Sequence, residues 1–159
     1  MLYRRPCLDD GQQLHHLIAS CPPLDPNSVY CNFLQCSHFA ETSVVVEQDG
    51  RLLGSITAYL LPDSPDTLFV WQVAVEPVAR GKKLAANMLK HLVQRLGPDV
   101  HFVETTVTPD NTTSWALFKS IARDYQADLS SLVWLDQDKH FNGHHASEHL
   151  IKIGPLNHE

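Results

Sequence analysis

The chain has 159 residues, enough for one domain with a full hydrophobic core. Hydrophobic residues make up 43% of the chain and charged residues 19%, as in an ordinary globular protein. The net charge of −6 argues against nucleic acid or an anionic membrane as the main partner. No stretch is apolar enough to span a bilayer and the N-terminus lacks a signal-peptide pattern, so we expect a cytoplasmic protein whose cysteines are free thiols.

The first quarter of the chain predicts a short strand followed by two helices. Residues 2–6 read as a strand that a proline ends. Asp9 or Asp10 can cap the first helix, and Asp25 or Asn27 the second. The apolar side chains expected along these helices are Leu14, Leu17 and Ile18 in the first and Tyr30, Phe33, Leu34 and Phe39 in and after the second.

Three consecutive strands are predicted next, over residues 42–47, 51–61 and 68–75. A Gln-Asp-Gly hairpin turn joins the first two, and a proline-containing turn over residues 62–66 leads to the third. The third strand is apolar at every position but Gln72, which is typical of a strand buried on both faces.

After this strand the period of the apolar residues becomes that of a helix, which Gly97 and Pro98 end. The first amides of a helix lack an intrahelical acceptor and lie at the positive end of its dipole. Gly81 would let a ligand approach the backbone closely, so the amides of residues 81–85 could bind a phosphate or pyrophosphate. A plain strand-to-helix connection is an equally good interpretation of this turn alone. The apolar stripe consists of Leu84, Ala85, Met88, Leu89, Leu92, Val93 and Leu96.

The last third of the chain predicts a strand over residues 100–108, a helix capped near Asn111, and strands over residues 131–135 and 148–153. The polar segment 136–147 is a loop long enough to be functional. Strands and helices alternate in the middle of the chain and hairpins flank it, which predicts one α/β domain with a mixed sheet and helices on both faces. The side chains expected on the inner side of the last helix are Trp115, Phe118, Ile121 and Ala122.

Ten histidines raise the possibility of a metal site. His145 and His149 have the i, i+4 spacing of two ligands on a helix, but the His-Glu-x-x-His motif is missing and the local pattern favours a strand. We therefore expect no metal.

Residues 73–85, Val-Ala-Val-Glu-Pro-Val-Ala-Arg-Gly-Lys-Lys-Leu-Ala, resemble the acyl-CoA-binding motif of the GNAT superfamily of N-acetyltransferases. That motif reads Arg/Gln-x-x-Gly-x-Gly/Ala, and Arg80 and Ala85 match its ends. Lys83 stands where the family usually has glycine. We expect Lys83 to have helical geometry, in which glycine is not required. Its side chain would either crowd the pyrophosphate or add a cation to it.

The order of the elements is also similar to the acetyltransferase fold, which implies a single N-acetyltransferase domain over residues 1–159. In that fold the strands carrying Val73 and Thr106 splay apart around the pantetheine arm of acetyl-CoA. Residues 111–118 resemble the second motif of the family, in which an asparagine and a small residue open a helix that supports the cofactor. Phe118 stands where many members have a tyrosine that protonates the leaving thiolate, so another group must supply this proton. The residues that the resemblance assigns to acetyl-CoA are Val73, Val75, Arg80, Gly81, Lys82, Lys83, Leu84, Ala85, Asn111, Ser114 and Phe118.

Four stretches, residues 24–30, 68–75, 106–118 and 144–150, resemble the diaminobutyrate acetyltransferases of the ectoine pathway, and the likeness covers nearly the whole chain. It implies acetyl transfer from acetyl-CoA to the side-chain amine of L-2,4-diaminobutyrate, by a homodimer. This substrate carries two ammonium groups and one carboxylate, so its site needs anionic partners and hydrogen-bond donors. The residues that the resemblance assigns to the substrate are Asp25, Tyr30, Trp71, His145 and Glu148.

Each of these residues also has a structural interpretation. Asp25 suits a helix cap, Tyr30 and Trp71 suit core aromatics, and Glu148 suits a solvated strand end. The resemblance favours Glu148, directly or through water, as the base that deprotonates the amine. It also implies that the backbone amide of Val73, at a bulge in its strand, binds the developing oxyanion.

Two alternative functions remain open. One is acetylation of another small diamine or amino acid. The other is a non-catalytic acyl-CoA-binding sensor, which Lys83 and Phe118 motivate because both depart from the family pattern.

Overall fold

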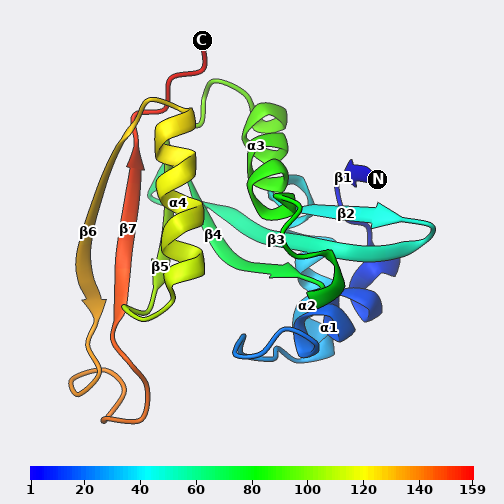
Figure 1. The fold of residues 1–159 in the computed structure, drawn as a ribbon, viewed down its shortest axis with the longest axis horizontal. Helices are drawn as coiled ribbons and strands as arrows, with labels where there is room; N and C mark the ends of the chain where they lie inside the picture. Colours follow the sequence, from blue (N-terminus) through cyan, green and yellow to red (C-terminus); the bar gives the residue numbers. More distant parts are fainter. The chain divides into compact units, whose positions relative to one another are not determined.

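The computed structural model describes residues 1–159 as two compact units, each with its own helices (Figure 1). The seven strands follow the order β1-β2-β3-β4-β5-β7-β6, and their alternation with helices confirms the predicted α/β class. β3 (Arg51–Leu61) and β4 (Ser64–Val75) contribute residues to both units. The first unit consists of Met1–Tyr59 and Val70–Gly97, and the second of Leu60–Phe69 and Pro98–Glu159.

The first unit is built on antiparallel strands. β1 (Leu2–Arg4) pairs with β2 (Val44–Gln48), and β2 pairs with β3 so that Val44 lies opposite Ile56. Its helices are the 3-10 helix η1 (Leu8–Asp10), α1 (Gly11–Ala19), α2 (Val29–Gln35), the 3-10 helices η2 (Ala40–Thr42) and η3 (Pro77–Ala79), and α3 (Leu84–Leu96).

Helices cover both faces of the strands in this unit. Val45 and Val46 are successive strand residues, so their side chains point to opposite faces. Val45 shares a core cluster with Leu14 of α1. On the other face, a β-carbon added to Gly54 would lie 2.9 Å from Met88 of α3 and 3.1 Å from Val46. The predicted two-sided arrangement is therefore confirmed in this unit, where glycine allows α3 to approach the strands closely.

Besides its parts of β3 and β4, the second unit contains three antiparallel strands and one helix. β7 (Glu148–Gly154) pairs with β5 (Phe102–Val107) on one side and with β6 (Asp128–Leu135) on the other. α4 (Thr112–Asp124) runs along β5 and β7 (Figure 1), and its Phe118, Ile121 and Ala122 are buried as predicted. Val73 belongs to the first unit and Thr106 to the second, and the splay of their strands stays a prediction.

Two strands are longer than predicted. β4 begins at Ser64 rather than Leu68, and β6 begins at Asp128 rather than Ser131. Pro65 is tolerated near the start of β4 because the end of a strand can do without one ladder hydrogen bond. The start of β6 is polar, so the hydrophobic pattern gave no signal there.

The predicted cap of the first helix is right in position, and that of the second is wrong. Asp10 is the N-cap residue of α1, but its carboxylate makes no capping bond there and accepts the backbone N–H of Cys7 at 2.8 Å and the guanidinium of Arg4 at 2.7 Å. α2 is capped by Ser28, whose hydroxyl accepts the N–H of Cys31 at 3.1 Å. Neither Asp25 nor Asn27 caps it, because the helix begins only at Val29.

α2 buries polar rather than apolar side chains. Asn32 and Gln35 are fully buried, whereas Tyr30 is 71% exposed. The amide of Asn32 donates to the side-chain oxygen of Gln35 at 2.9 Å, and its oxygen lies 2.9 Å from Nδ1 of His15. These bonds offset part of the cost of burying the two amides, although Nε2 of Gln35 has no hydrogen-bond partner.

All four cysteines are free, in keeping with the prediction. No helix has both the length and the apolar character required to cross a bilayer. No group of three or more His, Cys, Asp or Glu side chains is arranged to hold a metal ion.

Candidate active site

The connection from β4 to α3 presents free backbone amides. The N–H of Asn87 is bonded to the carbonyl of Lys83 at 3.0 Å, so the amides of residues 84–86 have no intrahelical acceptor. α3 has thirteen residues, enough for a helix dipole with its positive end at this loop. Gly81 has a φ of 82° and nothing within 4 Å of an added β-carbon. The loop is thus open to an anionic ligand.

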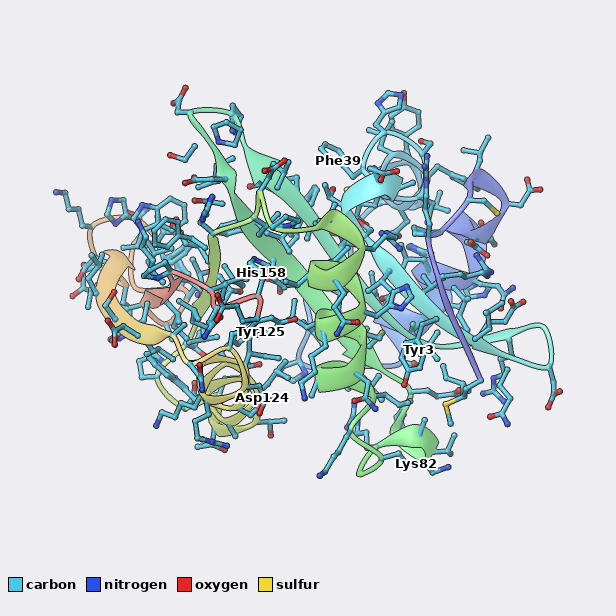
Figure 2. All side chains as sticks on the ribbon, turned by 90° about the horizontal axis from the view of Figure 1, so that it is seen from above. Tyr3, Phe39, Lys82, Asp124, Tyr125 and His158 are labelled. Atoms are coloured by element: carbon cyan, nitrogen blue, oxygen red, sulfur yellow. The ribbon has the colours of Figure 1, made fainter.

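Three cations lie in the same loop. Arg80, Lys82 and Lys83 are all exposed, and Figure 2 shows Lys82 at the margin of the molecule, ahead of α3. Arg80 turns back to β4, where its Nε donates to the carbonyl of Val75 at 3.2 Å. The thiol of Cys21 donates to the same carbonyl at 3.4 Å. These contacts tie the end of β4 to the loop that follows it and to the turn after α1.

The prediction that Lys83 has helical geometry is wrong. Lys83 is the N-cap of α3 and has a φ of 58° and a ψ of 27°, which is the left-handed conformation. The left-handed conformation costs a residue with a β-carbon about 1 kcal/mol or more, whereas glycine adopts it freely. The backbone geometry therefore explains the glycine that the acyl-CoA motif has at this position.

Three of the predicted substrate residues belong to the first unit. Asp25 lies in the exposed segment before α2, and Tyr30 follows on α2. Trp71 lies on β4, is 38% exposed, and packs edge-on against Tyr59 and Phe39 with ring centroids 5.7 and 5.9 Å apart. The exposure of Tyr30 rules out its interpretation as a core aromatic. Asp25 is likewise no helix cap.

The other two substrate residues belong to the second unit and lie close together. Nε2 of His145 is 4.0 Å from Oε1 of Glu148, whose side chain is 21% exposed. The Nδ1 atom of His145 is 2.6 Å from the carbonyl of Ala146, and its ring packs against Phe141 with centroids 4.6 Å apart. The imidazole is thus held from both sides, with one edge toward the carboxylate of Glu148.

The predicted second cofactor motif opens α4. Asn111 caps this helix, since its side-chain oxygen accepts the N–H of Ser114 at 3.1 Å. Phe118 is 2% exposed and belongs to the core of the second unit. No hydroxyl replaces the missing tyrosine at this position.

A family model described as the acetyltransferase (GNAT) family matches residues 11–122. The L-2,4-diaminobutyric acid acetyltransferase of Methylotuvimicrobium alcaliphilum is 48% identical over 153 residues, which cover 96% of this chain and 89% of that protein. The enzyme of the same name from Vibrio cholerae is also 48% identical over 153 residues, covering 96% of this chain and 88% of its own. The chain belongs to the L-2,4-diaminobutyric acid acetyltransferase family of GNAT enzymes.

Solved structures agree with this assignment. The diaminobutyrate acetyltransferase EctA from Paenibacillus lautus, in complex with its substrate L-2,4-diaminobutyric acid and coenzyme A, has a TM-score of 0.90 and 37% identity. The match covers 97% of this chain and 94% of that one. The ribosomal-protein-S18-alanine N-acetyltransferase from Escherichia coli, at 15% identity and a TM-score of 0.71, shares the fold and covers 98% of this chain and 93% of its own.

Sequence reasoning missed three residues near the predicted substrate residues of the first unit. Gln72 bonds to the segment that carries Asp25, and its one signal was its polarity within an apolar strand. Phe39 and Tyr59 hold Trp71. They gave no signal, because aromatic residues in distant elements show no spacing pattern.

Proposed function

We propose that the protein transfers the acetyl group of acetyl-CoA to the side-chain (N4) amine of L-2,4-diaminobutyrate, as a step of ectoine biosynthesis. The observation that carries this function is the match, at 37% identity and over 97% of the chain, to an enzyme solved with L-2,4-diaminobutyric acid and coenzyme A. The acetyl group passes directly from the thioester to the amine in a ternary complex. We also propose that residues 1–159 form a single N-acetyltransferase domain.

Acetyl-CoA is the co-substrate, and the chain has the groups that its diphosphate requires. The loop before α3 offers unbonded amides, an open glycine and three cations, and this donor set fits a diphosphate. No metal is needed for this contact. The residues proposed to hold acetyl-CoA are Val73, Val75, Arg80, Gly81, Lys82, Lys83, Leu84, Ala85, Asn111, Ser114 and Phe118.

Diaminobutyrate is held through its charges. Asp25 is exposed on a segment without secondary structure, where a carboxylate can pair with an ammonium group. Tyr30 and Trp71 supply aromatic walls, and the indole face of Trp71 favours a cation. His145 and Glu148 complete the set.

The amine must lose a proton before it attacks the thioester. Its pKa in water is about 10, taking lysine as the reference. Glu148, directly or through water, accepts this proton, and His145 at 4.0 Å orients its carboxylate. The backbone N–H of Val73 donates to the oxyanion that develops, and one such donor contributes about 3 kcal/mol of transition-state stabilisation. The thiolate takes its proton from water or another group, because Phe118 has no hydroxyl.

The enzyme forms a homodimer through β6 under this proposal. β6 ends the strand order and therefore has one unpaired edge. Its Leu132, Val133 and Trp134 are 57%, 52% and 50% exposed, and no charged residue lies between Leu129 and Leu135. Two copies of such a strand can pair about a two-fold axis. Four free cysteines and no disulfide suit the cytoplasm as its compartment.

A panel of amines tests the function. The protein is incubated with acetyl-CoA and, in turn, diaminobutyrate, ornithine, lysine or a polyamine, and the release of coenzyme A thiol is followed. We expect diaminobutyrate to have the highest kcat/KM of the panel. A higher value for another diamine would favour the broader acetyltransferase, and acetyl-CoA binding without thiol release on any amine would favour a sensor.

A further inference from the structure

We propose that Gln72 is a positioning residue, which clamps the substrate-binding segment around Asp25 to the strand that carries the oxyanion donor. This inference rests on the proposed function, because it names what sets the position of the diaminobutyrate ligand Asp25.

Both ends of the Gln72 side chain are used. Its Oε1 accepts the side-chain N–H of Asn27 at 2.8 Å, and its Nε2 donates to the backbone carbonyl of Asp25 at 3.0 Å. Gln72 is the one polar residue between Leu68 and Val75, and its side chain is half-buried. An amide group in an otherwise apolar strand is retained only where its donor and acceptor are both satisfied, as they are here.

The segment that Gln72 binds has little else to fix it. Residues 25–28 lie outside every helix and strand. No backbone-to-backbone hydrogen bond within the first unit involves residues 25–27, and Pro26 has no N–H to offer. Leu24, packed against the core, and Ser28, the cap of α2, hold only the two ends of the segment. The position of Asp25 between them therefore depends on the two bonds from Gln72.

Gln72 lies between two residues of β4 that we propose to act in substrate binding and catalysis. Trp71 and Val73 flank Gln72 on β4, and strand geometry points the Gln72 side chain to the face opposite theirs. One strand therefore carries an aromatic wall, the clamp and the oxyanion donor at three successive positions. A shift of about 1 Å in a reacting group can cost on the order of a hundredfold in rate, so this link between Asp25 and β4 matters for the reaction.

A cavity of the first unit lies apart from the residues of this inference. It has a volume of about 340 Å³ and is lined by polar groups of α1, β3 and Glu76. Arg51 pairs with the carboxylate of Glu76, and Gln13 bonds to the backbone of Gly50 and Leu52. The arginine and the glutamine amide of this lining are thus engaged within the first unit, and none of these bonds reaches the segment around Asp25.

Three variants test the clamp, with KM measured separately for diaminobutyrate and acetyl-CoA. Gln72→Met has a similar shape and loses both bonds, so we expect its KM for diaminobutyrate to rise at least roughly tenfold while its KM for acetyl-CoA stays within about twofold. Gln72→Glu keeps an acceptor for Asn27 but loses the donor to Asp25, so an intermediate rise is expected. Asn27→Ala, on an exposed segment, should give a smaller rise of the same kind and serves if Gln72→Met fails to fold.

Gln13→Met is the matched control. Gln13 also bridges a backbone N–H and a carbonyl in the first unit, at 3.2 and 3.4 Å, but these belong to Leu52 and Gly50. We expect Gln13→Met to leave both KM values unchanged.

Hydrogen exchange of the backbone amides of Cys31 and Asn32, which bond to the hydroxyl and the carbonyl of Ser28 at the end of the segment, gives a second readout that needs no turnover. It should become faster in Gln72→Met and stay unchanged in Gln13→Met. Equal changes of both KM values, or unchanged exchange in Gln72→Met, would overturn the clamp. If the wild-type protein fails to acetylate diaminobutyrate, the proposed function falls, and the exchange measurement still decides whether Gln72 holds the segment.

Discussion

Lys83 shows how one residue reports on the geometry of a ligand-binding loop. Its left-handed backbone is strained for any side chain, so Lys83→Gly should raise the free energy of unfolding by about 0.5–1 kcal/mol. Coenzyme A affinity should stay within roughly tenfold, or about 1.4 kcal/mol. Denaturant unfolding and titration calorimetry measure the two effects. A larger loss of affinity would mean that the Lys83 ammonium is itself a ligand of the diphosphate.

Asp25 is expected to act on one substrate alone. Asp25→Ala removes the proposed partner of a diaminobutyrate ammonium, which should raise the KM for diaminobutyrate about tenfold or more and leave the KM for acetyl-CoA nearly unchanged. Steady-state kinetics with each substrate varied in turn measure this. Asp9→Ala, at another exposed aspartate of the first unit, is the control. Similar effects on both substrates would refute the role of Asp25.

Glu148 is expected to set the acidic side of the pH profile. Glu148→Gln keeps the shape of the side chain but cannot accept a proton, so kcat should fall by about 10²–10⁴-fold and the acidic limb should disappear. The profile of kcat/KM against pH is the measurement. Glu104→Gln, on the neighbouring β5, should keep the limb. If Glu148→Gln keeps it as well, another group is the base.

At the scale of the elements, periodic patterns were predictable from the sequence and single contacts were not. The apolar stripe from Leu84 to Val93 correctly predicted which side chains of α3 are buried, because side chains three to four residues apart lie on the same face of a helix. In α2 the apolar pattern missed the buried side chains, because Asn32 and Gln35 are joined by a hydrogen bond that no hydropathy pattern records. The clamp from Gln72 to Asn27 likewise joins residues far apart in the chain.

In the candidate site, too, features that follow from a periodic pattern were predictable and individual backbone geometries and contacts were not. The free amides before α3 could be inferred from the change of period after β4, since every helix start has them. The φ of Lys83 could not, because it depends on how the chain must turn between Gly81 and the helix. Assignment of Asp25 and Glu148 came from the family resemblance and not from their own surroundings.

β6 is expected to be a contact between subunits. Trp134→Lys puts a charge on its exposed apolar surface, which should weaken the dimer and shift the protein toward the monomer. Sedimentation equilibrium at several concentrations measures the shift. Leu8→Lys places the same charge at an exposed leucine outside β6 and should leave the dimer intact. A wild-type protein that is monomeric throughout would contradict the proposed dimer.

For the whole molecule, one ion pair should couple stability to pH. Burial by itself raises the pKa of Asp10, but the two hydrogen bonds from Arg4, at 2.7 and 2.9 Å, and the N–H of Cys7 outweigh it, so the pKa of Asp10 is lowered. A lowered pKa in the folded state adds stability above the unfolded value of about 4, and this stability is lost as the pH falls through the folded value.

Arg4→Met removes the ion pair with Asp10 and a second one with Glu47, and should therefore lower the free energy of unfolding by about 2 kcal/mol at pH 7 and by clearly less at pH 3. Urea unfolding at the two pH values measures this difference. Arg5→Met removes an exposed ion pair with Glu41 and should cost less than about 1 kcal/mol. An Arg4→Met penalty that is the same at both pH values would show that Asp10 does not depend on Arg4.

The position of the acetyl group on the product tests the account most directly. Diaminobutyrate is incubated with the protein and acetyl-CoA, and the product is identified by mass spectrometry and by NMR coupling from the new amide proton to the carbon chain. We predict a single product acetylated on the side-chain N4 nitrogen. A product acetylated on the α-nitrogen, or no product while acetyl-CoA stays bound, would contradict it.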